Sequence, residues 1–233
     1  MPVPRGLLLG VYRWYKFIDL IPLRRLIRTR VEPGTVAIDV GAHLGFASRL
    51  LGIGVGPQGR VLALEPQSEM GPWITASGDN IRYLNAAAHE HDGLGSLSRG
   101  GSFGTDSYVS IGPGDTRLVA LDSLLVDLDG RRVSFLKIDA QGGEYEVLAG
   151  AETVLRIHRP DIFLELGGRG LARAGHTVDD VIRLLVNANY APHRTSLFGV
   201  RPIGIEAVVR NVRHRGFADY LFVHESRVRQ QGI

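Results

Sequence analysis

The chain has 233 residues, of which 44% are hydrophobic and 22% charged, as in a soluble globular protein with one domain and at most a short appendage. It contains no cysteine, which excludes disulfide bonds, thiolate nucleophiles and cysteine zinc sites. The formal net charge is +3 without an aromatic-rich basic groove, so we expect no nucleic-acid partner. No apolar run reaches the roughly 18 residues of a membrane span, and we expect a cytoplasmic protein.

Residues 1–31 are predicted to form a helical N-terminal extension. Apolar residues recur there at helical spacing, with arginine and lysine between them. Asp19 followed by Pro22 indicates that one helix stops and a second begins, because proline suits the first turn of a helix. We expect the extension to pack on the main domain, and peripheral contact with a membrane surface is the alternative. At the other end, residues 226–233 are interpreted as a basic tail.

Residues 32–225 alternate between strand and helix patterns, which favours an α/β fold with a doubly wound, mainly parallel sheet. Short apolar runs typical of buried strands occur at Val36–Val40, Arg60–Leu64, Ile81–Leu84, Val133–Asp139 and Ile162–Leu166. The last strands are predicted near Ile203–Val209 and Tyr220–Val223.

Helices are predicted from Phe46, from Glu144 to His158, and from a capping box at Thr177 and Asp180. The glycine-rich residues Gly52–Gly59 are interpreted as a linker between helix and strand. Residues 92–118, rich in glycine, serine and aspartate, are expected to form a loop or a short antiparallel excursion.

The most informative segment is Asp39-Val40-Gly41-Ala42-His43-Leu44-Gly45, which follows the first strand. In an open α/β sheet, ligands bind at the carboxyl ends of the strands where the strand order reverses. Glycines there let a ligand approach the backbone, and the start of the next helix offers unpaired N–H groups. Glu65 ends the second strand, where a carboxylate accepts hydrogen bonds from a ribose diol. Together these features predict an adenosine-containing ligand.

The glycine spacing distinguishes between cofactors. A dinucleotide fingerprint reads G-x-G-x-x-G, but position 43 is histidine, which disfavours a pyrophosphate. An NAD-dependent oxidoreductase therefore remains only as an alternative. S-adenosylmethionine, which carries a sulfonium, an ammonium and a ribose but no phosphate, suits the turn better.

Several segments in a fixed order resemble the FkbM family of S-adenosylmethionine-dependent methyltransferases, over roughly residues 33–225. They are Ile38–Gly45, Glu65-Pro66, Leu121–Leu125, Leu136–Glu144, Glu146–Ala151 and Pro160–Glu165. The resemblance implies a Rossmann-like class I methyltransferase fold and methyl transfer to oxygen. The implied acceptor is a hydroxyl group on a small molecule or glycan, such as a sugar, glycolipid or polyketide-type metabolite.

The resemblance also implies which residues bind the cofactor: the turn lines the methionine end, Glu65 holds the ribose, and residues 86 and 87 lie near the adenine. The predicted cofactor-binding residues are Asp39, Gly41, Ala42, His43, Gly45, Phe46, Glu65, Pro66, Ala86 and Ala87. The chain departs from the family in three places: His43 replaces asparagine, Gln141-Gly142-Gly143 replaces a Glu-Gly pair, and the helix in residues 67–80 is shortened. These departures keep a non-catalytic cofactor-binding or scaffold protein as a second hypothesis.

Methylation of an alcohol needs a base, and acidic residues at the strand ends are the candidates. The predicted catalytic residues are Asp139, Glu144, Glu165 and His193. A divalent cation bound by Asp139, Glu144 and Glu165 is a further hypothesis. The spacing of these residues is not diagnostic of a metal site, so we assign no metal ligands. Glu144 alternatively caps its own helix, and His43 either contacts the cofactor or acts as a base. Lys137 is expected to form a salt bridge with Asp139, and Asp122 to cap a helix.

Overall fold

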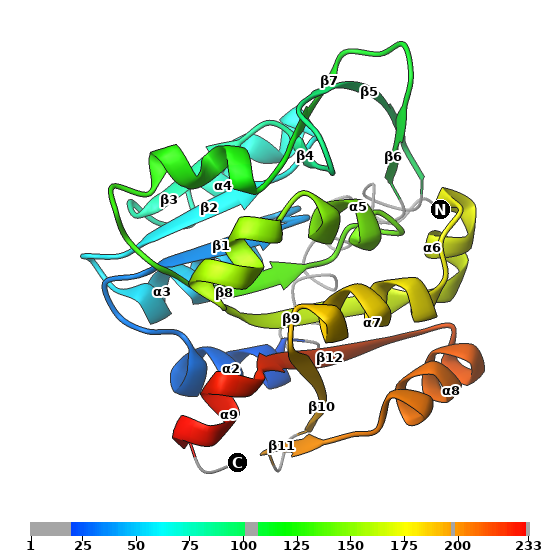
Figure 1. Cartoon of the computed structure of the whole chain (residues 1–233). Coiled ribbons are helices and arrows are strands. Elements are labelled where there is room, and N and C mark those ends of the chain that lie inside the picture. The colour runs from blue at the N-terminus through cyan, green and yellow to red at the C-terminus, as the bar shows by residue number, and fades with distance from the viewer. Residues whose placement is uncertain (1–19, 101–106, 197–198, 232–233) are drawn as a thin grey trace, which may run out of the picture.

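The computed structural model describes residues 20–100, 107–196 and 199–231. Its centre is an eight-stranded sheet in the order β11-β10-β12-β9-β8-β1-β2-β3 (Figure 1). Parallel pairing joins β3, β2, β1, β8 and β9, whereas β12 is antiparallel to both of its neighbours. The predicted doubly wound, mainly parallel sheet is therefore confirmed. The strands of this sheet are β1 (Val36–Val40), β2 (Arg60–Leu64), β3 (Ile81–Leu84), β8 (Val133–Ile138), β9 (Asp161–Gly167), β10 (Tyr190–Ser196), β11 (Gly199–Pro202) and β12 (Phe217–His224).

Strand β1 lies near the middle of the sheet, and all five of its residues are buried. Val36, Ile38 and Val40 face one apolar core, while Ala37 faces the other. A strand covered by helices on both faces needs apolar residues on both sides, which explains its continuous apolar pattern. The chain order reverses between β1 and β8, so their carboxyl ends form the edge where a ligand is expected.

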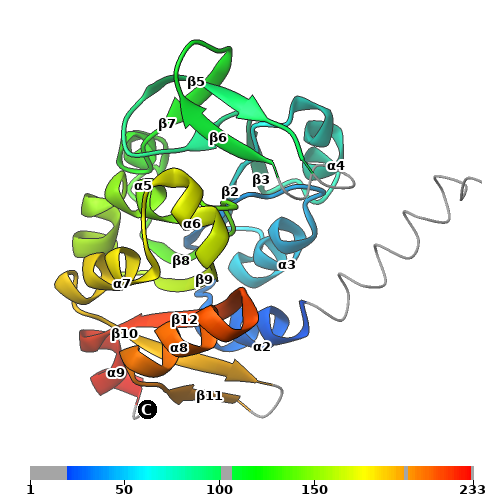
Figure 2. The ribbon, with the colours of Figure 1, turned by 90° about the vertical axis from the view of Figure 1, so that its right-hand side faces the viewer.

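Helices cover both faces of the sheet, with α5 and α7 on one side and α2 and α3 on the other (Figure 2). Within the described residues, no helix is both long and apolar enough to span a membrane. The helices are α2 (Ile21–Arg30), α3 (Phe46–Val55), α4 (Gly71–Thr75), α5 (Glu144–Ala149), α6 (Gly168–Ala174), α7 (Val178–Asn187), α8 (Ile205–Arg215) and α9 (Glu225–Gln231). Short 3₁₀ helices cover Ser68–Met70 and Asp122–Asp127, and a π-helical turn covers Val154–His158.

Helix α2 packs on the domain as the sequence predicts, with Leu23 and Leu26 fully buried against the core beside α3. The first helix predicted before Asp19 lies outside the described residues. The interpretation of Gly52–Gly59 as a linker is wrong in its first half, because α3 continues to Val55. A Cβ atom on Gly54 would lie 2.6 Å from a methyl carbon of Ile27, so glycine here allows two helices to approach closely.

Two other predictions need correction. The strand predicted at Ile203–Val209 is wrong: helix α8 begins at Ile205 after Gly204, and its buried valines, including Val208 and Val212, lie at helical spacing. The helix predicted over 144–158 is interrupted at Gly150, where α5 ends before the π-helical turn. The excursion predicted in residues 92–118 does form, as antiparallel strands of a second sheet.

This second sheet is inserted between β3 and β8 and has the order β4-β7-β5-β6. Its strands are β4 (Ala87–Ala88), β5 (Gly93–Ser98), β6 (Tyr108–Ile111) and β7 (Thr116–Val119). In Figure 2 it lies at one end of the molecule, beside α4 and α6.

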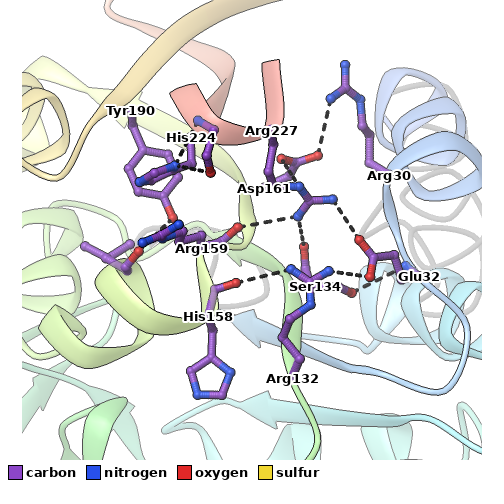
Figure 3. A network of polar contacts seen from close by, with 12 residues as sticks. Arg30, Glu32, Arg132, Ser134, His158, Arg159, Asp161, Tyr190, His224 and Arg227 are labelled. Carbon is purple, nitrogen blue, oxygen red and sulfur yellow. Dashed lines mark hydrogen bonds and ion pairs between the residues drawn. The ribbon is translucent and has the colours of Figure 1, made fainter. Parts of the chain in front are cut away.

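Helices from the two ends of the described chain meet at the amino ends of β1, β8 and β9, in a polar network (Figure 3). Arg30 of α2 and Arg227 of α9 both face the buried carboxylate of Asp161, at 3.5 and 3.7 Å. Arg227 also pairs with Glu32 at 3.0 Å and is itself 7% exposed. The interpretation of residues 226–233 as a tail is therefore wrong for α9, because Arg227 belongs to the interior.

Candidate active site

The glycine-containing turn after β1 is held in a conformation that other residues rarely adopt. Gly41 and Gly45 have φ angles of +73° and +76°, and His43 between them has +49°. A Cβ atom on Gly41 would lie 1.9 Å from the carbonyl oxygen of Asp139, so the turn presses against the end of β8. The N–H groups of Gly41 and Ala42 both donate to the carbonyl of Leu64 at 3.0 and 3.1 Å. The turn is thus fixed to both neighbouring strands.

Asp39 lies beneath this turn and is fully buried. The Ser48 hydroxyl donates to its Oδ2 at 2.6 Å, and the ammonium of Lys137 lies 3.2 Å from its Oδ1. Lys137 also donates to the carbonyls of Val40 and Gly41 at 3.1 and 2.8 Å. Asp39 is among the predicted cofactor-binding residues, but in the structure its carboxylate pairs with Lys137, and the pair supports the turn from inside.

Glu65 joins the ends of β1 and β2. Its Oε2 accepts from the N–H of His43 at 2.9 Å, and its Oε1 accepts from the N–H of Gln67 at 3.0 Å. Asn85 donates to the carbonyls of Glu65 and Pro66 at 3.2 and 2.9 Å, which fixes the corner beyond the strand. The Glu65 carboxylate, which is predicted to hold the ribose, is therefore fixed against the turn that is predicted to line the methionine end.

The remaining predicted cofactor residues lie around the same strand ends. Phe46 begins α3 and is partly exposed, whereas Ala86 and Ala87 are buried just after β3. Tyr83 donates to the carbonyl of Glu65 at 3.2 Å, and burial raises the pKa of its hydroxyl. Tyr83, Asn85 and Gln67 were missed from the sequence: Tyr83 and Asn85 bind backbone carbonyls around Glu65, and Gln67 donates to the Glu65 carboxylate itself.

Two of the predicted acids meet beside the turn. Asp139 follows β8 and Glu165 lies near the end of β9, and the side-chain amide of Gln141 contacts both. Its Nε2 lies 2.7 Å from Oδ1 of Asp139 and 3.5 Å from Oε1 of Glu165. Lys137 lies 3.7 Å from Oδ2 of Asp139, so the predicted salt bridge is confirmed. The Asp139 side chain is 24% exposed and can reach a ligand.

Glu144 differs from these acids because it is 2% exposed. Its Oε1 accepts from the N–H of Gly142 at 2.9 Å, while its Oε2 is buried without a hydrogen-bond partner. Burial raises the pKa of Glu144 to about 7, and the nearby charge of Asp139 adds to the shift. Glu144 therefore sits behind the exposed acids, at the start of α5.

His193 does not lie at the strand ends where Asp139 and Glu165 meet. It lies within β10, paired with Leu221 of β12, while Leu221 in turn pairs with Phe163 near the start of β9. Its ring is 1% exposed, it contacts the carbonyl of Ala191 at 3.0 Å, and burial lowers its pKa. The structure thus separates His193 from the other predicted catalytic residues. No group of three or more potential metal ligands is found within the described ranges.

The inserted β5–β6 hairpin is attached on both sides of the turn. Arg99, just after β5, forms a bidentate ion pair with Glu69, with nitrogen–oxygen distances of 2.5 and 3.2 Å. Across the hairpin, Tyr108 of β6 lies under the guanidinium of Arg173 on α6, 3.9 Å from the ring centre. Glu69 follows β2 and Arg173 follows β9, and β1 and β8 lie between those strands. The β5–β6 hairpin therefore extends across the carboxyl ends of β1 and β8, where Asp139 lies.

Comparison with known proteins identifies relatives of this architecture. The family model of the methyltransferase FkbM domain matches residues 39–192. A protein-L-isoaspartate O-methyltransferase from Triticum aestivum is 34% identical over 68 residues, which are 29% of this chain and 28% of the wheat protein. The chain thus spans less than a third of that relative.

A solved structure shows the same fold at low sequence identity. A structure from Clostridium thermocellum, assigned provisionally as an rRNA methylase, is 10% identical with a TM-score of 0.53 and covers 88% of this chain and 94% of its own. The methyltransferase FkbM from Methylobacillus flagellatus KT is 15% identical with a TM-score of 0.48, covering 90% of this chain and 60% of its own.

Proposed function

Because the chain belongs to the FkbM methyltransferase family, whose methyl donor is S-adenosylmethionine, we propose that it methylates a hydroxyl group of a small molecule or glycan. The family, the cofactor and the Rossmann-like class I fold agree with the predictions from the sequence. The acceptor is the proposed part, and we expect a sugar, glycolipid or polyketide-type metabolite. The wheat relative's name specifies methyl transfer to oxygen, which supports oxygen as the acceptor atom.

The residues around β1 and β2 suit S-adenosylmethionine. When bound, this cofactor supplies a methyl group already activated on a sulfonium, so the protein mainly positions the reactants. The backbone at Gly41–Gly45 is where the cofactor would be held, because this turn lies at the carboxyl end of β1 and at the start of α3. Glu65 would hold the ribose hydroxyls while keeping its bonds to the turn, since each carboxylate oxygen accepts more than one hydrogen bond.

One observation carries the proposal for a hydroxyl acceptor: a partly exposed carboxylate, Asp139, stands beside the cofactor turn at the end of β8. An alcohol must lose its proton during methyl transfer, and a carboxylate within hydrogen-bond reach accepts it. Asp139 is the base that we propose. Glu165 would accept a hydrogen bond from the acceptor, and Glu144 is too deeply buried to touch it.

The first test is calorimetric titration with S-adenosylhomocysteine. We expect binding by the wild-type protein and about 10- to 100-fold weaker binding by Glu65→Gln, since hydrogen bonds to a charged group are worth about 1.5–3 kcal/mol. Glu69→Gln is the matched control, because Glu69 is 45% exposed and forms its ion pair with Arg99 of the hairpin. Equal affinity of wild type and Glu65→Gln would contradict the assigned ribose contact.

The second test measures methyl transfer to a panel of sugars and polyketide alcohols. Asp139→Asn should bind the cofactor normally but lose at least about 100-fold in kcat, the usual contribution of a general base. Turnover that survives in Asp139→Asn would remove Asp139 as the base. Cofactor binding without turnover on any hydroxyl acceptor would instead favour the non-catalytic hypothesis.

A further inference from the structure

Gln141 has contacts that the proposed reaction does not by itself explain. Its side-chain amide lies between two carboxylates, with the short 2.7 Å hydrogen bond to Asp139 and the longer 3.5 Å contact to Glu165. A side-chain amide nitrogen carries two hydrogens and can therefore donate to two acceptors. The two carboxylates are thus joined by a neutral donor.

The backbone of Gln141 is held in place by its neighbours. Its φ angle is +53°, a conformation that a residue with a side chain adopts only when its surroundings impose it. The guanidinium of Arg173 donates to its carbonyl at 2.9 Å. The next residue, Gly142, packs so tightly on Gly170 that a Cβ atom on Gly170 would lie 2.9 Å from the Gly142 Cα. These contacts aim the Gln141 amide at the two acids.

The arrangement also orients Asp139 from two sides. Lys137 lies 3.7 Å from its Oδ2, and the Gln141 amide holds its Oδ1. Two such contacts restrict rotation of a carboxylate that would otherwise turn freely at the protein surface. Positioning of this kind matters for catalysis, because a misplacement of about 1 Å can cost roughly a hundredfold in rate.

We propose that Gln141 is a positioning residue that holds Asp139 and Glu165 side by side at the acceptor position and takes the place of a bound cation there. This inference rests on the proposed role of Asp139 in acceptor chemistry. The neutral amide at position 141 is what allows this arrangement. A glutamate there would donate no hydrogen bond, and its carboxylate would face those of Asp139 and Glu165. Hard divalent cations bind where carboxylate oxygens converge in this way.

The first experiment titrates Mg²⁺ and Mn²⁺ into folded wild-type protein, Gln141→Glu and Gln141→Asn by calorimetry. We expect the tightest binding in Gln141→Glu, with a dissociation constant at least tenfold below that of the other two proteins. Gln141→Asn is the matched control, since asparagine tolerates the left-handed conformation but is one methylene shorter. Equal cation binding by all three proteins, or none by folded Gln141→Glu, would overturn the proposal.

The second experiment separates positioning from folding. With an acceptor from the panel, Gln141→Asn should lower kcat at least tenfold and leave the affinity for S-adenosylhomocysteine within twofold of wild type. Unchanged kcat would overturn the positioning role even if the protein is an active methyltransferase. If no hydroxyl acceptor is turned over at all, the proposed function fails, whereas the cation titration still tests the arrangement around Gln141.

Discussion

Lys137 places its ammonium 3.2 Å from Oδ1 of Asp39, across two neighbouring strands and under the cofactor turn. Asp39 is fully buried and the Lys137 side chain is 8% exposed, so little water screens this pair. Because the same ammonium donates to the carbonyls of Val40 and Gly41, the ion pair and the turn form one unit. A change at β8 should therefore disturb cofactor binding at β1.

Substitution Lys137→Met tests this coupling. It leaves the Asp39 carboxylate buried without its cation, which typically costs about 3–5 kcal/mol of unfolding free energy. We expect a loss in that range by urea denaturation, together with weaker binding of S-adenosylhomocysteine. The double variant Asp39→Asn/Lys137→Met should recover part of the stability, because no buried charge is then left alone. A fully additive double-mutant cycle would show that the two residues do not interact.

The glycine at position 41 is predicted to be irreplaceable for steric reasons and not only for its φ angle. Gly41→Ala would bring a Cβ atom to 1.9 Å from the Asp139 carbonyl oxygen, so β1 and β8 would have to separate. We expect a loss above about 3 kcal/mol, more than overpacking alone usually costs, and no detectable cofactor binding.

Gly34 provides the matched control for this prediction. Its φ of +79° is close to that of Gly41, but a Cβ atom there would meet nothing within 4 Å. Gly34→Ala should cost only about 1–2 kcal/mol, the price of the left-handed conformation itself, and should leave binding intact. Similar losses in unfolding free energy for the two variants would argue against the steric explanation.

The cofactor-binding part of the site was predictable because the residues that indicate it lie close together in the sequence. Gly41 and Gly45 flank one turn, and Glu65 ends the very next strand, so strand order alone brings them together. The partner of Asp39 was not predictable in this way. Lys137 was assigned to Asp139, its neighbour along β8, and only the register of β1 against β8 shows that it also lies beside Asp39.

The errors in the fold have a similar origin. Val208 and Val209 are β-branched and suggested a strand, but packing on β12 overrides that weak preference and they lie in α8. The charged end of the chain suggested a solvated tail, because nothing in the local sequence indicates a buried acid for Arg227. In both cases, contacts between residues far apart in the sequence determined the local structure.

The network that joins the chain ends should contribute substantially to stability. Arg227→Met removes the ion pairs with Glu32 and Asp161 and the hydrogen bonds to the carbonyls of Ser134 and Arg159. Since Asp161 is fully buried, we expect a loss of about 3 kcal/mol in urea denaturation. Arg183→Met is the control: its side chain is 70% exposed beside Asp180, and such pairs contribute about 0.5 kcal/mol or less. Equal losses from the two variants would mean that burial of Arg227 does not matter.

The buried Glu144 should make stability depend on pH in a defined direction. Its pKa is raised from 4.5 to about 7 in the folded state, so the native protein binds this proton more tightly than the unfolded chain. The resulting stabilisation is complete below pH 4.5 and is lost as the pH rises through 7, by roughly 3 kcal/mol in total. Glu144→Gln keeps an acceptor for the Gly142 N–H but cannot ionise.

The measurement is the difference in unfolding free energy between wild type and Glu144→Gln, from urea denaturation at pH values between 4.5 and 8. Wild type should lose stability relative to the variant as the pH rises, with the steepest change between about pH 5 and 7. Glu152→Gln is the control, because it removes a carboxylate that is 73% exposed and therefore lacks the burial of Glu144. A pH-independent difference for Glu144→Gln would show that burial does not hold the proton on Glu144.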